Sequence, residues 1–165
     1  MEIKQLSKDI LALSKVMISV SVTYTAFAGY IIAGAKSDIK LLALLPGVFV
    51  LSSGASAFNH VLERKTDALM GRTSSRPIPA GRLSVRFALT YAVLATLTAC
   101  LVLLLNFHWI VAMLGIFNLL WYNLVYTPLK RTTVWAVFVG TITGVLPFYM
   151  GYLSPALRFP SHEAH

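Results

Sequence analysis

Long uncharged segments alternate with short polar segments along this chain of 165 residues. A helix needs about 20 apolar residues to cross the hydrocarbon core of a bilayer. Backbone amides in lipid must be satisfied within the segment, which favours helices. Five windows of 18 to 20 residues contain no Asp, Glu, Lys or Arg: 16–35, 41–58, 87–105, 109–127 and 134–153. The pattern predicts an all-α fold, a polytopic transmembrane helical bundle of five spans, in one membrane domain covering residues 1–165.

The polar segments predict how the spans are connected. Residues 1–15 place apolar side chains at helical spacing beside three lysines, as in a helix lying at the membrane interface. Residues 59–86 form the longest connection, a loop that carries most of the candidate chemistry. Its first part, through Met70, contains no Gly or Pro and can extend the second span. Gly71, Pro77 and Pro79 then break the helix, because proline lacks an amide donor and restricts the preceding residue. We expect the chain to re-enter the membrane at about Phe87.

Composition and charge agree with a membrane protein. Hydrophobic residues make up 57% of the chain and charged residues 12%, against about 25% charged in average globular proteins. The net charge of +8 could indicate nucleic-acid binding, but its distribution follows topology. Eleven of the fourteen basic residues fall on one side of a five-span arrangement, and only Lys36, Lys40 and Arg158 fall on the other. The positive-inside rule places the N-terminus and residues 59–86 in the cytoplasm and explains most of the basic excess without nucleic acid.

Three oxygen-bearing side chains lie at the start of the long loop. Asn59, Glu63 and Asp67 are spaced by four residues, so a helix would place them on one face over about 12 Å. Carboxylate and amide oxygens are hard ligands, and Mg²⁺ is usually held by one or two carboxylates together with substrate phosphates. Basic side chains nearby could hold the remaining phosphate oxygens; these are Arg64, Lys65, Arg72 and Arg76. Solvated ion pairs at a helix end, worth under about 1 kcal/mol, are the alternative that spacing alone leaves open.

The fourth window has a polar face of its own. Asn118, Tyr122 and Tyr126 recur every four residues and could border a substrate cavity. Hydrogen bonding between helices and the aromatic belt at the interface explain the same pattern. In the fifth window, Gly140 and Gly144 predict close packing of two helices.

Two motifs carry a family resemblance. The first is Asn59-x-x-x-Glu63-x-x-x-Asp67, followed by Arg72-Thr73-x-x-Arg76-Pro77-Ile78-Pro79-x-Gly81. The second is Tyr126-Thr127-Pro128-Leu129-Lys130-Arg131-Thr132, leading into Gly140-x-x-x-Gly144-x-x-Pro147 and Gly151. Both resemble the UbiA superfamily of intramembrane prenyltransferases, and within it the heme O synthase (protoheme IX farnesyltransferase) subfamily. The resemblance extends from the first span to Gly151.

The resemblance implies a function and a set of site residues. Heme O synthases transfer a farnesyl group from farnesyl diphosphate to a vinyl group of heme b, which gives heme O for terminal oxidase assembly. The expected location is the bacterial cytoplasmic (inner) membrane. By resemblance, Asn59, Glu63 and Asp67 orient Mg²⁺ and the diphosphate. Arg72 and Arg76 line the same pocket, and Tyr126 and Lys130 approach it from the next loop. Further substrate-binding residues are expected at Arg64, Lys65, Asn118, Tyr122 and Arg131.

The chain also departs from the family. Glu63 replaces the more usual Asp, and Lys65 stands where many members have another Asp. The family resembles a bundle of nine spans with two acidic motifs, whereas the only acid after Asp67 is Glu163. A truncated product and a second chain that supplies the other half both explain this difference.

Three other functions are consistent with the sequence to different degrees. A different UbiA-type prenyltransferase would use an aromatic or quinone-precursor acceptor. An inactive membrane subunit would bind prenyl diphosphate or heme without turnover. A channel or transporter is disfavoured, because the charges cluster at one mouth of the bundle rather than at mid-membrane.

Overall fold

The computed structural model describes residues 3–35 and 39–157. Within these ranges the secondary structure is helical and contains no strand, so the predicted all-α class is confirmed. The helices are Ile3–Leu13 (α1), Val16–Ile32 (α2), Leu41–Leu69 (α3), Val85–Asn106 (α4), Trp109–Leu120 (α5), the π-helix Trp121–Tyr126 (η1), Thr127–Leu129 (α6) and Ala136–Ala156 (α7). Lys36, Arg158 and Glu163 lie outside the described residues.

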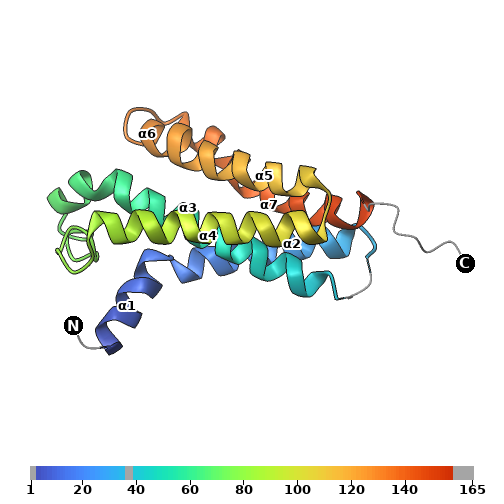
Figure 1. Ribbon diagram of the computed structural model, residues 1–165. Coiled ribbons are helices and arrows are strands. Elements are labelled where there is room, and N and C mark those ends of the chain that lie inside the picture. Colours follow the sequence, from blue (N-terminus) through green and yellow to red (C-terminus); the bar gives the residue numbers. More distant parts are fainter. Residues whose placement is uncertain (1–2, 36–38, 158–165) are drawn as a thin grey trace, which may run out of the picture.

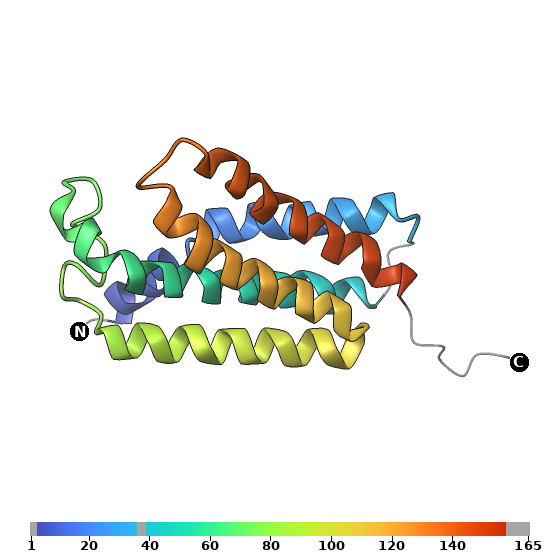
Figure 2. The ribbon, with the colours of Figure 1, turned by 90° about the horizontal axis from the view of Figure 1, so that it is seen from above.

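The long helices run lengthwise beside one another, while α1 projects from one end of the bundle (Figure 1). Helix α3 packs against both α2 and α4, α4 contacts α5, and α5 and α2 both pack against α7. Seen from above, α4 forms one edge of the bundle, and α2 and α7 lie together at the opposite edge (Figure 2). The helices thus form a closed ring in the order α2, α3, α4, α5 and α7.

The spans agree with the predicted windows in four cases, and the first differs. Four segments are long and apolar enough to cross a membrane: Leu41–Leu69, Val85–Asn106, Trp109–Leu129 and Ala136–Ala156. Helix α2 has only 17 residues and ends at Ile32, whereas the predicted first span reached residue 35. Helices α1 and α2 meet at a bend of 47°, and they are long and apolar enough to cross a membrane only when the two are counted together as one broken span. The bend sets α1 at an angle to α2, and the location of residues 1–15 at the membrane interface stays a prediction.

Glycines bring α2 and α7 into backbone contact. A Cβ atom built on Gly29 would lie 2.1 Å from the Phe148 carbonyl oxygen, and one on Gly151 would lie 1.8 Å from the Ala26 carbonyl oxygen. Only residues without a side chain allow this approach. The sequence had predicted close packing at Gly140 and Gly144 instead. Gly140 does lie against the ring of Tyr126, but the prediction was wrong for Gly144, which faces open space.

The segment after α3 folds back toward the bundle. Helix α3 continues to Leu69, so the predicted extension of the second span is confirmed, and Met70 is already extended. Gly81 then adopts a left-handed conformation with φ of 72°, which glycine tolerates without a steric penalty. Ser84 caps α4 by accepting a hydrogen bond from the Phe87 amide.

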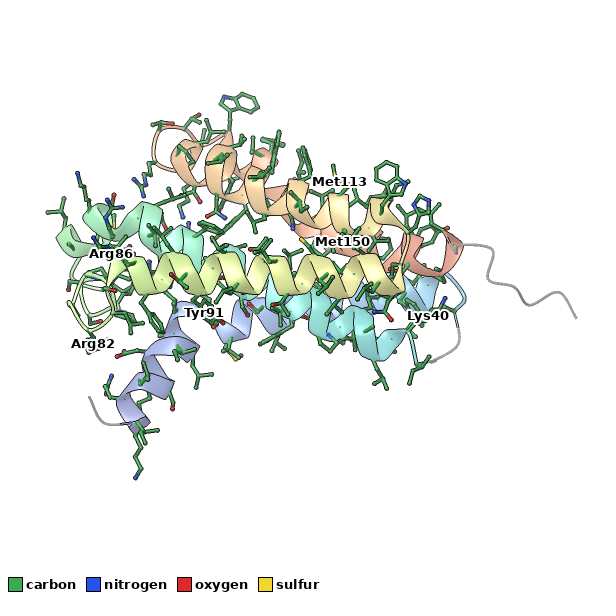
Figure 3. All side chains as sticks on the ribbon, in the orientation of Figure 1. Lys40, Arg82, Arg86, Tyr91, Met113 and Met150 are labelled. Carbon is green, nitrogen blue, oxygen red and sulfur yellow. The ribbon has the colours of Figure 1, made fainter. Side chains whose placement is uncertain are left out.

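One end of the bundle, here called the loop end, carries the α1–α2 joint, the α3–α4 loop and the α6–α7 loop. Arg82 and Arg86 lie at this end, and Lys40 lies at the other end of the bundle (Figure 3). The predicted inner segments are therefore gathered on one side of the bundle, as the sequence analysis expected.

Candidate active site

Helix α3 delivers the three predicted oxygen ligands to the interior of the loop end. Asn59, Glu63 and Asp67 are 0%, 7% and 4% exposed, so their common face points into the protein. Acidic side chains are almost never fully buried unless they are paired. Each of the three is paired, and the partners come from three different segments of the chain.

Asp67 is paired within the α3–α4 loop. Its Oδ2 atom accepts a hydrogen bond of 2.7 Å from Nη1 of Arg76. The Thr73 hydroxyl donates to the Asp67 backbone oxygen at 3.0 Å. These two contacts fold the loop back over the end of α3, which places Arg76 beside the carboxylate that the sequence analysis assigned to the same pocket.

Glu63 is paired with the loop between α6 and α7. Its Oε1 atom lies 2.9 Å from Nζ of Lys130 and 3.2 Å from Nη2 of Arg131. The Lys130 ammonium also lies 5.6 Å from the centre of the Tyr126 ring, within the range of a cation–π contact. The second motif of the sequence is therefore joined to the first through one carboxylate oxygen.

Asn59 is held from two sides. Its Oδ1 atom accepts a hydrogen bond of 2.5 Å from Nζ of Lys15, and its Nδ2 atom donates to the Thr127 hydroxyl at 2.9 Å. The Thr127 hydroxyl donates its own proton to the Tyr122 backbone oxygen at 2.8 Å, so toward Asn59 it can only accept. This chain of bonds fixes the orientation of the Asn59 amide, with the oxygen turned toward Lys15.

Lys15 occupies the joint between α1 and α2, just before the first uncharged window. Its side chain is partly buried, and Lys15 lines the same pocket as Arg76. Desolvation penalises the charged form of a lysine, and a like charge nearby adds to the penalty. The joint thus carries a cation that an anionic ligand would stabilise.

The chemistry of the site follows from its charges. Four cationic groups, on Lys15, Arg76, Lys130 and Arg131, surround the two carboxylates of Glu63 and Asp67, which leaves two positive charges in excess. An excess of positive charge in a partly desolvated site attracts polyanions such as phosphates. The arrangement can hold an anion through its basic groups and offer oxygen ligands to a metal ion that the anion brings.

The donor set fits Mg²⁺ only as part of such a complex. The described part of the chain contains no group of three or more His, Cys, Asp or Glu side chains able to hold a metal ion. Two carboxylates and one amide oxygen are available, and both carboxylates, those of Glu63 and Asp67, already form ion pairs. Mg²⁺ commonly binds through one or two carboxylates, water and substrate phosphates, and this requirement is met.

Three predicted phosphate-binding residues are not brought to this cluster. Arg64 donates to the Val61 backbone oxygen at 2.7 Å, because it follows Glu63 directly and so points about 100° away from it around α3. Lys65 and Arg72 are exposed and make no ion pair among the described residues. Their assignment to the phosphates stays a prediction from the sequence.

The fourth span has an irregularity that the sequence analysis did not predict. Residues 121–126 form a π-helix, a rare form that is frequently found at functional sites. Within it, the rings of Tyr122 and Tyr126 stack with their centres 5.8 Å apart. The Thr127 hydroxyl bonds the backbone oxygen five residues earlier, which matches the wider π-helical turn. The π-helix therefore presents Tyr126 to Lys130 and Thr127 to Asn59.

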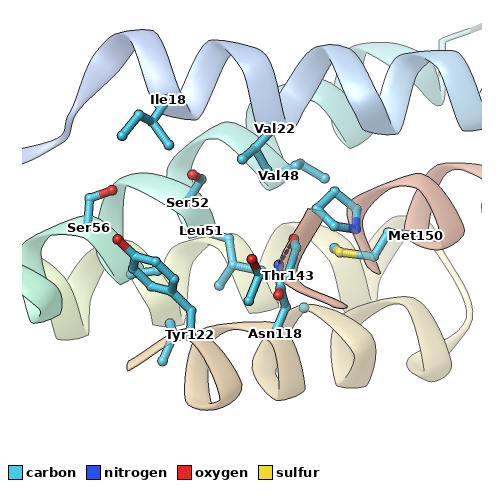
Figure 4. Close-up of a pocket in the computed structure, with 14 residues that line it drawn as sticks. Ile18, Val22, Val48, Leu51, Ser52, Ser56, Asn118, Tyr122, Thr143 and Met150 are labelled. Atoms are coloured by element: carbon cyan, nitrogen blue, oxygen red, sulfur yellow. Dashed lines mark hydrogen bonds between the residues drawn. The ribbon is translucent and has the colours of Figure 1, made fainter. Parts of the chain in front are cut away.

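A cavity of about 110 Å³ lies deeper in the bundle between α2, α3, α5 and α7. Apolar side chains such as Ile18, Val22 and Met150 form most of its wall (Figure 4). Asn118 and Tyr122 line it as well, whereas Tyr126, the third residue of the predicted polar face, lines a different pocket beside Lys130. The binding of substrate by these residues stays a prediction. The Asn118 amide donates to the Thr143 backbone oxygen at 3.3 Å, and its own oxygen is buried without a hydrogen bond. A mostly apolar cavity with a few polar groups is typical of a small-molecule site.

Sequence reasoning missed two residues of the cluster, Lys15 and Thr127. Lys15 was counted only as one of the basic residues that set the topology. The available signal was its place as the last charged residue before the first uncharged window. Thr127 stands in the second motif but was given no role there, because its contact with Asn59 depends on the π-helix that precedes it.

The sequence matches a family model described as the UbiA prenyltransferase family over residues 22–158. A protoheme IX farnesyltransferase from Flavobacterium psychrophilum is 35% identical over 161 residues, which are 95% of this chain and 53% of the relative. Another, from Salinibacter ruber, is 41% identical over 147 residues, which are 87% of this chain and 52% of the relative. The chain spans about half the length of the curated relatives it matches.

The fold also matches solved structures of a UbiA homologue from Archaeoglobus fulgidus. One, bound to DMAPP and Mg²⁺, superimposes with a TM-score of 0.76 at 16% identity and covers 93% of this chain and 56% of that one. The other, bound to GPP and Mg²⁺, gives a TM-score of 0.75 at 18% identity. At these identities the agreement establishes a shared helical architecture.

Proposed function

The chain belongs to the UbiA prenyltransferase family, and we propose that it supplies the diphosphate-binding half of a protein that transfers a farnesyl group from farnesyl diphosphate to a vinyl group of heme b. The product would be heme O, the hydroxyethylfarnesyl heme that terminal oxidases use. Relatives named protoheme IX farnesyltransferase, similar over most of this chain, support the choice of substrates. We place the protein in the bacterial cytoplasmic membrane with its loop end in the cytoplasm, as the distribution of basic residues favours.

One observation carries the proposal: every oxygen ligand on the buried face of α3 is matched by a cation from another segment. Asn59 faces Lys15, Glu63 faces Lys130 and Arg131, and Asp67 faces Arg76. A complex of Mg²⁺ with a diphosphate presents both charges at once. Its metal would take the oxygens of α3, and its phosphate oxygens would take the cations. Buried ion pairs seldom stabilise a fold strongly. We therefore propose that the cations and oxygen ligands of the cluster exchange their contacts with one another for contacts with the Mg²⁺–diphosphate complex.

The reaction needs this charge arrangement because diphosphate is a poor leaving group. The bond between the farnesyl C1 carbon and the diphosphate oxygen breaks, and the electron pair leaves with the oxygen. Arg76 and Lys130 would hold the negative charge that develops there, where scarce water makes fixed cations most effective. Bound Mg²⁺ supplies further neutralisation of the same charge as a Lewis acid.

The allylic carbocation that remains is attacked by the electrons of the vinyl group, which forms the new carbon–carbon bond. The positive charge passes to the vinyl carbon next to the porphyrin, where a water molecule adds and releases a proton. The apolar cavity that reaches from Ser56 and Tyr122 toward Met150 would exclude water from the first cation. We assign this cavity to the reacting end of the isoprenoid.

The proposal is tested by the haem content of cells. The chain would be expressed in a bacterium that lacks its own heme O, and extracted haem would be separated and weighed by mass spectrometry. Farnesylated, hydrated haem in these cells, and its absence with Asp67→Asn, would support the proposal. A prenylated aromatic compound without modified haem would instead support the alternative acceptor, a quinone precursor.

A second candidate is a subunit that binds prenyl diphosphate without turnover. The cluster at the loop end favours it, because its cations and oxygen ligands are the groups that binding of a Mg²⁺–diphosphate complex requires. Mg²⁺-dependent binding of farnesyl diphosphate by the purified chain, together with unmodified haem in the cells, would select this candidate. Co-expression with the second half of a relative would then show whether product formation returns.

A further inference from the structure

Lys15 has an unusual backbone conformation and lies at a bend between two helices. It is the only residue in the described part of the molecule, apart from glycines, with a positive φ, at 44°, and it forms the joint at which α1 and α2 bend by 47°. A side chain in the left-handed region strains the backbone, and such strain persists only where surrounding contacts determine it. The strained residue is also the one whose ammonium reaches Asn59.

Contacts on both sides of Lys15 fix the joint. Asp9, which is 2% exposed, accepts hydrogen bonds of 3.0 and 3.1 Å from Nε of Arg82 in the α3–α4 loop. The hydroxyl groups of Ser14 and Tyr91 lie 2.7 Å apart, which ties the joint to α4. Ser19 donates to the Ser14 backbone oxygen at 3.0 Å. The backbone that carries Lys15 is thus attached to the loop and to α4 before any ligand binds.

The ammonium group of Lys15 is unusual among the cations of the cluster. Arg76, Lys130 and Arg131 each lie within ion-pair distance of a carboxylate, whereas Lys15 makes no ion pair among the residues that the structure describes. Its hydrogen bond goes to the neutral oxygen of Asn59. An ammonium has three donors, so two remain for a ligand. A half-buried charge whose hydrogen-bond partner is neutral costs free energy unless an anion also pairs with it.

Space for an anion adjoins this group. An open pocket of about 410 Å³ is lined by Lys15, Arg76 and Arg82 together with His60, Ser75 and Pro77. Lys15 and Arg76 therefore face the same opening, and each also contacts an oxygen-bearing side chain of α3. A ligand in this opening can bond both cations while its metal ion approaches Asn59 and Asp67.

We propose that Lys15 is a diphosphate-binding residue: its ammonium holds the Asn59 oxygen in place in the free protein and moves to a phosphate oxygen when the Mg²⁺–diphosphate complex binds. The inference rests on the proposed function and adds a residue from the α1–α2 joint to a site otherwise built from α3 and two loops. It also assigns a function to α1, because the anchored helix determines the direction from which the Lys15 side chain enters the site.

The test measures the affinity of the purified chain for inorganic pyrophosphate with Mg²⁺, by calorimetry in nanodiscs of neutral phosphatidylcholine. Loss of a charge-assisted hydrogen bond predicts that Lys15→Met weakens binding by about 10- to 100-fold. Lys15→Arg, which keeps the charge, should remain within several-fold of the natural chain. Lys8→Met, which changes an exposed lysine of the neighbouring helix α1, is the matched control and should bind normally.

Lys15→Gly separates binding from folding. Glycine removes the ammonium but accepts a positive φ without strain, so this variant should fold and should bind as weakly as the Met variant. Normal binding by both the Met and Gly variants, while Asp67→Asn abolishes binding, would overturn the role of Lys15 and leave the proposed function standing. No Mg²⁺-dependent binding by the natural chain would overturn both. An effect of Lys15 that appears only in anionic phosphatidylglycerol nanodiscs would assign it to lipid and would also overturn the inference.

Discussion

The ammonium group of Lys130 lies 2.9 Å from a carboxylate oxygen of Glu63. This contact joins the loop after the fourth span to the end of the second span, and Arg131 reaches the same oxygen at 3.2 Å. The two motifs that are far apart in the sequence therefore meet at this carboxylate, as they also do through the hydrogen bond from Asn59 to Thr127. The pairing explains why the sequence keeps an acid at this buried position.

Replacing Glu63 by Gln tests whether this pairing serves binding or stability. Both basic partners are about a third exposed and can be hydrated when the carboxylate is lost, so we expect a stability loss below about 1 kcal/mol. We expect a larger effect on Mg²⁺–diphosphate affinity, about 10-fold or more, because a charged carboxylate ligand is replaced by a neutral amide. Thermal unfolding in detergent and calorimetry measure the two effects on the same sample. A large stability loss with unchanged affinity would assign Glu63 to the fold instead.

The contact between α2 and α7 predicts a second pair of results. A methyl group on Gly29 would overlap the Phe148 carbonyl oxygen, so Gly29→Ala must push the two helices apart. Overpacking of this kind costs about 1–3 kcal/mol. Gly144→Ala is the control, because nothing lies within 4 Å of the new atom and alanine favours helix over glycine by roughly 0.5–1 kcal/mol. Unfolding curves should move in opposite directions for the two variants, and equal shifts would contradict the packing described for α2 and α7.

Loss of the ion pair between Asp9 and Arg82 should increase local unfolding near α1 without unfolding the rest of the bundle. Asp9→Asn removes the charge that anchors α1 to the α3–α4 loop, while the other helices keep their contacts. Hydrogen–deuterium exchange should accelerate in residues 3–13 and in the loop, and it should stay slow in α3 and α4. Because an anchored α1 also directs Lys15, the same variant should weaken diphosphate binding. Unchanged exchange in residues 3–13 would show that other contacts hold the helix.

The sequence predicted the parts of the fold that depend on length and period. The uncharged windows marked the spans because lipid leaves few alternatives to a helix. The four-residue spacing of Asn59, Glu63 and Asp67 placed them on one buried face, as the structure confirms. The first span was predicted too long, because Gly34 and Ala35 are uncharged like the residues before them, yet the helix ends at Ile32.

What the sequence could not predict depends on contacts between distant segments. The π-helix at 121–126 arises where Thr127 bonds Tyr122 and Asn59, which no local pattern shows. Lys15 joined the site only because the chain bends at the α1–α2 joint. Arg64, by contrast, was expected near the phosphates from its position beside Glu63, and helix geometry turned it away. The glycines that pack helices were also misplaced, since spacing alone does not reveal which face meets a neighbour.

The central claim is that the buried face of α3 binds a diphosphate through Mg²⁺. Titration of the purified chain in neutral nanodiscs with farnesyl diphosphate, with Mg²⁺ and with excess chelator, tests it most directly. The account predicts saturable binding that requires Mg²⁺ and that falls by at least about 10-fold in Asp67→Asn. Binding of equal strength without Mg²⁺, or in the Asp67→Asn variant, would contradict the claim and leave the three side chains of α3 with a purely structural role.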